Sequence, residues 1–508
     1  MAYSRTKNSM LTMLTSGVRQ ALTLILTFVS RTVFIHVLGA EYLGLNGLFS
    51  NILSLLALSE LGIGSAISFY LYKPLVDKDQ DRIRVLMTFY KKCYELVGVF
   101  IIVIGCSLMP FLKYIVNFDQ GVDVNLYIVY FLYILNSASS YFLFAYKQAL
   151  VTANQEQYKI EKINILFTFI NCIADIVILL IFRDYIVYLI SKFSLVLLKN
   201  FIIGVRIDKE YPYIKSKGDE KLSKEELKLF FNDLKSVALF RVGSTLFNAT
   251  DNIIISIMLG TVFVGYYSNY FLIISQLTLV IGLIIRSFTA SIGNVVAKEN
   301  KQKQYKIFKQ LDFGVFVVGT ICTTCLFQLF NSFVRLWVGR IDENYVLSQT
   351  VVFFLSISFY FDTTTQVMNS YREASGNFAT GRSLQLFGGI TNIVLSVVLG
   401  YFFKMEGIFA ATVVCKGFIT VTPFVIGVAK NVFSLPGGVL LKKYYANMFV
   451  MIGCLLLCWF ACRFIHMGNI GFLILEGIIA CVIPIVVIIL FFGRSEEVKA
   501  LLTRVRRK

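Results

Sequence analysis

Charged residues and histidines are scarce in this sequence. Only 15% of its 508 residues are charged and 57% are hydrophobic, which excludes a soluble protein because one chain cannot bury so much apolar surface. The two histidines, His36 and His466, lie far apart in the sequence, so a histidine metal site is not expected. The GxxxxGKS/T, HExxH and GxSxG motifs are absent, which leaves P-loop ATPases, zinc proteases and serine hydrolases unsupported. We therefore expect neither an enzyme nor a cofactor.

Apolar segments of membrane-crossing length are abundant instead. About 20 apolar residues suffice for a helix to cross a bilayer, so the pattern predicts an all-α polytopic membrane protein with about fourteen transmembrane helices. The predicted spans lie near residues 11–37, 46–72, 93–112, 127–153, 163–182, 185–204, 236–259, 266–290, 312–331, 347–371, 384–403, 407–429, 446–466 and 470–493. The ten cysteines fall almost wholly inside them, and we interpret these as small buried packing residues.

The net charge of +18 is distributed in a way that indicates topology. With the N-terminus in the cytoplasm, the inside segments hold 36 of the 48 Lys and Arg residues, whereas the outside loops and the spans hold six each. Such an excess on one side is the positive-inside pattern of membrane proteins. We therefore expect both termini to be cytoplasmic, and we expect no nucleic-acid partner.

One long polar segment divides the chain. Residues 206–235 are expected in the cytoplasm and end in SKEELKLFFNDLK, where Ser223 and Glu226 form a capping-box pattern. Apolar residues then recur at i, i+3, i+4 and i+7, which predicts an amphipathic helix on the inner membrane surface. The predicted organisation is a six-helix lobe over 1–205, this linker over 206–235, a second six-helix lobe over 236–430, and two extra helices with a basic cytoplasmic tail over 431–508.

The two lobes are related by an internal repeat. LGAEYLGLNGLFSN (38–51) aligns with LGTVFVGYYSNYFL (259–272) at an offset of 221 residues, and both contain Leu-Gly-x4-Gly. Six spans separate the copies, an even number, so both copies have the same orientation. The pattern predicts lobes related by a parallel pseudo-two-fold axis along the membrane normal, as in some secondary transporters. We expect the glycines of the motif to permit turns and close approaches between spans: Gly39, Gly44, Gly260 and Gly265.

Cationic and hydroxylated side chains follow one face of the first span. Arg19 and Arg31 lie about 120° apart on a helical wheel, together with threonines and serines, and the opposite face is Leu, Ile and Val. An arginine at the centre of a bilayer costs about 2.5–3.5 kcal/mol on insertion scales. This polar stripe is therefore expected to face a water-filled cavity.

The seventh predicted span repeats the arrangement. It places Arg241 on one face with asparagines at helical spacing, and Asp251 at the edge of that face. Arg286 in the eighth span is a further candidate. We predict that substrate-binding residues of the cavity are Arg19, Arg31, Arg241, Asn248, Asn252 and Arg286.

The charges in the spans are also compatible with roles outside a binding site. Arg31 lies toward one end of its span, from where its side chain could reach the lipid head groups. Lys192 and Lys416 are the remaining cations inside predicted spans, and a small error in the boundaries would place them outside. Arg19 and Arg241 could form structural ion pairs with acids inside the spans, for which the candidates are Glu60, Asp175, Asp251, Asp362 and Glu476.

The sequence resembles the Wzx-type polysaccharide flippases of the multidrug/oligosaccharidyl-lipid/polysaccharide exporter superfamily. The resemblance extends over essentially the whole chain, and it implies two six-helix lobes around a central cavity plus two C-terminal helices. It also implies that Arg19, Arg31 and Arg241 line this cavity, whereas Arg286 is added from the sequence pattern alone. The segments that carry it are SRTVFIHVLGAEYLGLNGLFSNILSLLALSELGIGSAI (30–67), DNIIISIMLGTVFVGYYSNY (251–270), NSFVRLWVG (331–339) and GIFAATVVCKG (407–417).

The resemblance implies a cargo as well. An oligosaccharide repeat unit on undecaprenyl diphosphate would move from the inner to the outer leaflet of a bacterial cytoplasmic membrane, by alternating access, for surface polysaccharide synthesis. A diphosphate suits arginine-lined walls because a guanidinium offers a fork of hydrogen-bond donors. The implied partners are this lipid-linked oligosaccharide, the membrane lipids and the polysaccharide polymerase machinery.

Two further functions are kept as alternatives. A multidrug exporter of the same fold would favour acidic residues for cationic drugs, and the excess of cations in the spans argues against it. A membrane glycan polymerase or ligase would be expected to carry a large outside loop, whereas the long polar segment of this chain is inside. The coupling ion, a proton or sodium, is also open, and the candidate carboxylates for it are Asp251, Glu60 and Asp362.

Overall fold

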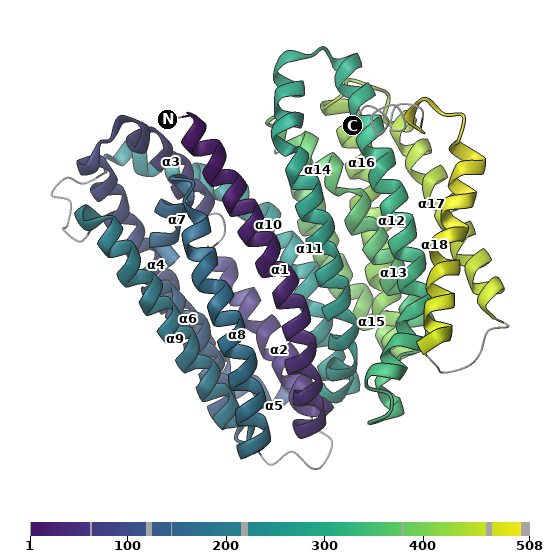
Figure 1. Cartoon of the computed structure of the whole chain (residues 1–508), viewed down its shortest axis with the longest axis horizontal. Helices are drawn as coiled ribbons and strands as arrows, with labels where there is room; N and C mark the ends of the chain where they lie inside the picture. The colour runs from purple at the N-terminus through teal and green to yellow at the C-terminus, as the bar shows by residue number, and fades with distance from the viewer. Residues whose placement is uncertain are drawn as a thin grey trace. The chain divides into compact units, whose positions relative to one another are not determined.

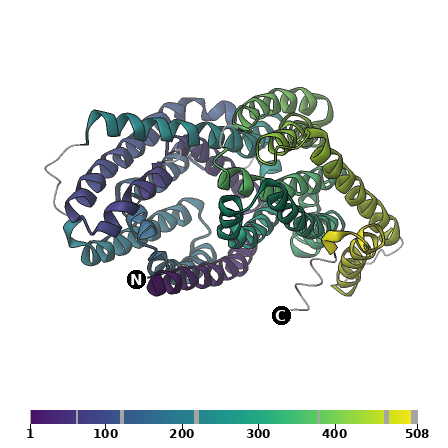
Figure 2. The same cartoon turned by 90° about the horizontal axis from the view of Figure 1, so that it is seen from above.

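The protein is almost entirely helical. The computed structural model describes residues 2–60, 63–117, 124–143, 145–214, 222–377, 380–463 and 470–498, and no strand occurs among these residues. Figures 1 and 2 show the helices from two directions at right angles. Within the described ranges, eleven helical segments are long and apolar enough to cross a membrane. The predicted all-α polytopic class is confirmed.

Eleven segments correspond to fourteen predicted spans because two spans lie in one segment and two others are not counted. The segment Ser383–Asn431 contains two spans, since α15 (Arg382–Val414) turns sharply at Lys404, where φ is 51° and ψ is −130°. This turn coincides with the loop predicted between the eleventh and twelfth spans. The second span is broken into helices too short to count, and the seventh lies in α10 (Lys224–Leu259), part of whose side chains lie outside the described residues.

Contacts divide the chain into two compact units, Met1–Gly265 and Tyr266–Lys508. The predicted lobes were defined by the sequence repeat and not by contacts, so the predicted lobe boundaries stay a prediction. The helices of the first unit are α1 (Ala2–Leu38), α2 (Ala40–Leu56), η1 (Ala57–Glu60), α3 (Ile63–Asp77), α4 (Gln80–Leu108), α5 (Leu112–Ile115), α6 (Leu126–Leu143), α7 (Ala145–Ala153), α8 (Gln157–Phe182), α9 (Tyr185–Glu210) and α10. The second unit contains most of α11 (Thr261–Lys298), then α12 (Lys301–Trp337), α13 (Gln349–Thr364), α14 (Gln366–Ala374), α15, the π-helix η5 (Cys415–Val421), α16 (Thr422–Asn431), α17 (Gly437–Cys462) and α18 (Ile470–Phe492).

The predicted amphipathic helix exists, but it is not a separate element. Ser223 caps α10 as expected, because its hydroxyl accepts the Glu226 N–H at 3.2 Å and the Glu226 carboxylate accepts the Ser223 N–H at 2.9 Å. The helix then continues without a break into the seventh predicted span. Its Phe230 is buried against the rings of Phe89 and Tyr90, and Glu226 forms an ion pair with Arg82. The start of α10 is therefore held by protein contacts within the first unit.

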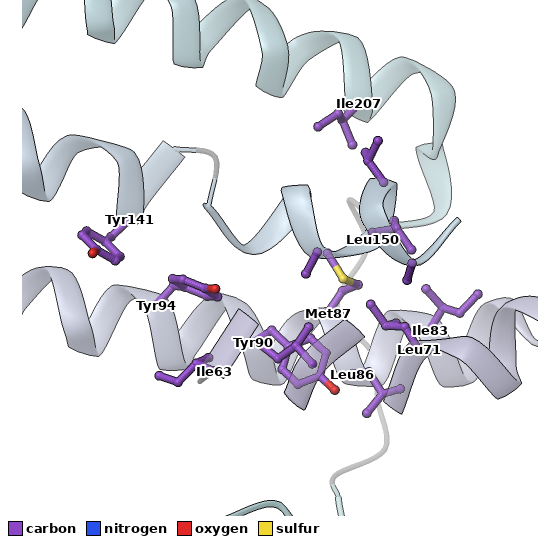
Figure 3. Close-up of a cluster of buried hydrophobic side chains, with 14 of the residues drawn as sticks. Ile63, Leu71, Ile83, Leu86, Met87, Tyr90, Tyr94, Tyr141, Leu150 and Ile207 are labelled. Atoms are coloured by element: carbon purple, nitrogen blue, oxygen red, sulfur yellow. The ribbon is translucent and has the colours of Figure 1, made fainter. Parts of the chain in front are cut away.

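A cluster of buried hydrophobic side chains packs several helices of the first unit together. Side chains of α3, α4, α6, α7 and α9 meet there, and Figure 3 shows Leu71, Met87, Tyr90, Leu150 and Ile207 pointing into the cluster. Each of these five is at most 3% exposed. Close packing of these side chains holds the helices together, so this core fixes the position of α9, which carries Lys192.

The glycines of the repeat form a reciprocal contact. A Cβ at Gly44 would lie 1.9 Å from the carbonyl oxygen of Thr261, and a Cβ at Gly265 would lie 2.1 Å from the carbonyl oxygen of Ala40. The offset of 221 residues converts one of these contacts into the other, as a two-fold axis requires. Gly39 and Gly260 have positive φ values of 87° and 112° at the preceding turns. The expected turns and close approaches are therefore present, and they support the parallel repeat.

Candidate functional site

The two faces of α1 differ as the sequence predicts. Its apolar face is open to the surroundings, with Leu14, Val18 and Ile25 each more than 50% exposed. The opposite face carries Arg19 and Arg31 and packs mainly against α8 (Figure 1). An exposed apolar face suits contact with lipid, whereas the cationic face is turned into the first unit.

A polar cavity of about 290 Å³ lies in the first unit between α1, α2, α8 and α9. It contains Arg31 from the predicted set, whereas Arg19 and Asn252, the other predicted binding residues whose side chains the structure describes, do not line it. Its walls consist of Leu26, Thr27, Ser30, Arg31, Phe34, Leu43, Asn46, Thr168, Asn171, Cys172, Asp175, Tyr188 and Lys192. The cavity therefore combines two cations, one acid, two amides and several hydroxyl groups, which is a set suited to binding a small anion.

The charges in this cavity are asymmetric. The Lys192 ammonium donates to the Asp175 carboxylate with an Nζ–Oδ2 distance of 2.6 Å, and it lies 5.4 Å from the centre of the Tyr188 ring. Among the lining residues that the structure describes, Asp175 is the one acid, whereas Arg31 and Lys192 are both cationic. The ionised cavity thus carries one net positive charge. Lys192 lies inside α9, as the predicted span requires. Asp175 was predicted as a possible partner of Arg19 or Arg241, and it pairs with Lys192 instead.

Arg19 belongs to a different cluster. Its Nε lies 2.5 Å from Oε2 of Glu161 in α8, and Lys199 of α9 lies within electrostatic range. Twelve residues separate Arg19 from Arg31 along α1, which corresponds to about 18 Å of helix. Arg19 is paired with Glu161 and does not line the cavity that contains Arg31. The ion-pair role of Arg19 is supported, although Glu161 was assigned to a cytoplasmic segment by the sequence and was not among the candidate acids.

The role of Arg19 can be tested by changing both members of its ion pair. Arg19→Met alone should lower the free energy of unfolding by up to about 3 kcal/mol, because the Glu161 side chain is only 7% exposed and would lose its partner. Adding Glu161→Gln should restore stability in thermal unfolding of the purified protein. If the double variant also transports normally, Arg19 is structural; if it is stable but inactive, Arg19 contacts the cargo.

The other predicted binding residues lie mostly beyond what the structure describes. The side chains of Arg241, Asn248 and Arg286 are outside the described residues. Asn252 and Asp251 of α10 are each 5% exposed and do not line the cavity. The predicted grouping of arginines from the first and seventh spans around one site therefore stays a prediction.

The remaining candidates for ion coupling have identified partners. Glu60, in the break of the second span, accepts hydrogen bonds from Tyr94 at 3.4 Å and Tyr141 at 2.8 Å. In the second unit, Lys416 donates to both carboxylate oxygens of Asp362, at 3.0 and 2.8 Å. Lys416 lies in η5, and π-helical turns often occur at functional sites. It is 8% exposed and inside a helix, so the sequence boundaries placed it correctly.

Solved transporter structures share this fold, whereas no protein-family model and no curated protein sequence matches the chain. The chain is similar to an inward-facing multidrug resistance MATE family transporter of the MOP superfamily, with 14% identity and a TM-score of 0.65, over 83% of this chain and 96% of that one. It is also similar to the lipid II flippase MurJ in an inward closed conformation, with 15% identity and a TM-score of 0.65, over 95% and 99%.

A third neighbour is a MOP superfamily transporter from Pyrococcus furiosus, whose description reports a reverse polarity of the binding pocket. It matches with 11% identity and a TM-score of 0.58, over 84% of this chain and 96% of that one. The chain thus has the fold of the MOP-superfamily membrane transporters. The flippase match covers 95% of this chain, which leaves fewer residues unmatched than α17 and α18 contain together, so at least part of the predicted C-terminal pair is matched by that structure.

Proposed function

We propose that the protein is a flippase that moves an undecaprenyl-diphosphate-linked oligosaccharide repeat unit from the inner to the outer leaflet of a bacterial cytoplasmic membrane. The observation that carries this proposal is the cavity in which Arg31 and Lys192 face a single carboxylate. A cationic pocket with amide and hydroxyl donors suits a phosphate or diphosphate group. The similarity to a lipid II flippase supports a lipid-linked cargo, and alternating access of the two lobes would carry the bound group across.

The size of the cavity limits which part of the cargo it binds. Small-molecule pockets are typically about 300–1,000 Å³, and this cavity of about 290 Å³ lies just below that range. It has room for the phosphate groups but not for an oligosaccharide or a polyprenyl chain. In this proposal Arg31 binds the diphosphate, and the sugars lie outside the cavity.

The multidrug exporter remains the second candidate, because one solved neighbour is a MATE family transporter. Its cargo would be cationic drugs, which the net positive charge of this cavity disfavours. A polymerase or ligase is a weaker third candidate, since the solved neighbours are transporters.

Equilibrium binding to the protein in nanodiscs separates the flippase from the multidrug exporter. A short-chain polyprenyl diphosphate should bind in an Arg31-dependent manner, and a cationic dye should not. The opposite pattern would favour the exporter.

The proposed topology makes a separate prediction about accessibility. Lys209 and Arg340 are both exposed, and the positive-inside pattern assigns the first to the cytoplasm and the second to the outside. A cysteine at position 209 should react with a membrane-impermeant maleimide only in inside-out vesicles, and a cysteine at position 340 only in intact cells. The reverse pattern, scored by the mass shift of the labelled protein, would invert the transport direction proposed here.

A further inference from the structure

The cavity contains its own anion. The Asp175 side chain is 8% exposed and its Oδ2 lies 2.6 Å from Nζ of Lys192, whose side chain is 30% exposed. Ser30 of α1 also forms a side-chain hydrogen bond with this carboxylate. The positive charge of the cavity is therefore partly neutralised by a carboxylate that belongs to its wall.

An incoming anion must compete with this carboxylate. Lys192 and Arg31 are the two cations that line the cavity, and a doubly charged ligand would gain most by engaging both. The ammonium of Lys192 already directs one N–H donor at Asp175, so an anion can take over that hydrogen bond only if the ion pair opens. A lysine side chain can make this change because four rotatable carbons carry its ammonium, and the Tyr188 ring lies beside it as a second favourable neighbour.

We propose that Asp175 is an internal competitor for the anionic group of the cargo, which must displace it from Lys192 in order to bind. This inference rests on the proposed function, in which the same cavity holds the phosphate groups of a lipid-linked cargo. Asp175 keeps the empty cavity from capturing the small inorganic anions of the cell. It also promotes release, because recapture of Lys192 by Asp175 expels the bound group.

The test is anion binding to the purified full-length protein with inorganic pyrophosphate as the probe, measured by isothermal titration calorimetry. Asp175→Asn keeps the shape of the side chain and removes its charge. It should tighten pyrophosphate binding about tenfold to a hundredfold, which corresponds to one charge-assisted hydrogen bond freed for the ligand. Lys192→Gln and Arg31→Gln should weaken binding in either background. A short-chain polyprenyl diphosphate in nanodiscs, measured in parallel, shows whether the lipid-linked form responds in the same way.

A matched control exists in the same unit. Lys147 and Asp208 form an ion pair with the same distance of 2.6 Å, and neither residue lines the cavity. Asp208→Asn therefore breaks an equivalent pair elsewhere and should leave pyrophosphate affinity within about twofold of the wild-type value. A similar tightening in Asp208→Asn would show that the effect is a general change in charge and would overturn the assignment to Asp175.

The pH dependence of the wild-type protein gives a measurement that needs no variant. Protonation of Asp175 would free Lys192, so affinity should rise as the pH falls from about 8 to about 4. Sulfate is the suitable probe because it stays doubly charged over this range. The other charged or titratable groups that line the cavity around Asp175 are Arg31 of α1, Lys192 and Tyr188 of α9 and Cys172 of α8. The rise should be absent in Asp175→Asn.

The possible results separate this inference from the function on which it rests. Pyrophosphate binding that depends on Arg31 but is unchanged or weaker in Asp175→Asn would overturn the competitor role, since Asp175 would then only orient Lys192. A lack of Arg31-dependent binding in both the wild type and Asp175→Asn would instead overturn the anion cavity itself. A wild-type affinity for sulfate that does not rise at low pH would count against the competitor role even if the variant fails to fold.

Discussion

Replacement of Arg31 by alanine is expected to lower the rate of flipping by tenfold to a hundredfold while the protein still inserts into the membrane. Arg31 is one of two cations in the cavity of about 290 Å³, and each charge-assisted hydrogen bond to a phosphate is worth about 1.5–3 kcal/mol. Arg31→Lys should be intermediate, because the charge is kept but the planar fork of donors is lost. The measurement is the initial rate of transfer of lipid-linked oligosaccharide in proteoliposomes.

The control for this prediction is a cation that lies outside the cavity. Lys303 is 58% exposed and pairs with Glu299, which lies four residues earlier in the turn between α11 and α12; exposed ion pairs of this kind contribute about 0–1 kcal/mol. Lys303→Ala should therefore transport at nearly the wild-type rate. Equal losses in Lys303→Ala and Arg31→Ala would indicate a nonspecific effect of charge, and normal transport in Arg31→Ala would exclude Arg31 from the binding site.

Substitution of Gly44 or Gly265 by alanine is expected to cause the largest loss of stability in the first unit. The added Cβ would lie 1.9 Å from the Thr261 carbonyl oxygen in one case and 2.1 Å from the Ala40 carbonyl oxygen in the other. Both obstacles are backbone atoms, so the helices themselves must separate. Overpacking of this kind costs about 1–3 kcal/mol and sometimes more, and each variant should lower the free energy of unfolding by about 3 kcal/mol or more.

The repeat makes this prediction specific, because the two contacts are equivalent and the two variants should lose similar amounts. Gly453 of α17 has no heavy atom within 4 Å of an added Cβ, and Gly453→Ala should be neutral or slightly stabilising since alanine favours helix more than glycine does. Thermal unfolding in detergent measures all three variants. A stable Gly44→Ala would contradict the close crossing, and unequal losses at Gly44 and Gly265 would contradict its two-fold character.

Elements with strong local signals could be predicted from the sequence. The turn at Lys404 and the capping box at Ser223 and Glu226 lie where the pattern places them, because short-range chemistry determines both. The continuity of α10 was missed, although no proline lies between Lys224 and Leu259 to end a helix there. Its polar first part resembles a surface helix, and packing of Phe230 within the first unit overrides that local preference.

The partners inside the candidate site were harder to predict because they depend on packing between helices. One signal was available: α8 and α9 form a hairpin around Arg183, and Asp175 and Lys192 lie at nearly equal distances from that turn. The contact of Arg19 with Glu161 has no such signal, since it depends on how α1 lies along α8. Arg31 was predicted to face a cavity because an arginine in an apolar helix is costly wherever the helix packs, and it does line one; its role in binding stays a prediction.

The direct test of the central claim is transport of a radiolabelled undecaprenyl-diphosphate-linked oligosaccharide in liposomes that contain the purified protein. We expect the wild-type protein to transfer this lipid between leaflets, Arg31→Ala to transfer it at one-tenth of that rate or less, and neither protein to export a cationic dye. Export of the dye without transfer of the lipid, or equal transfer by the wild type and Arg31→Ala, would contradict the account.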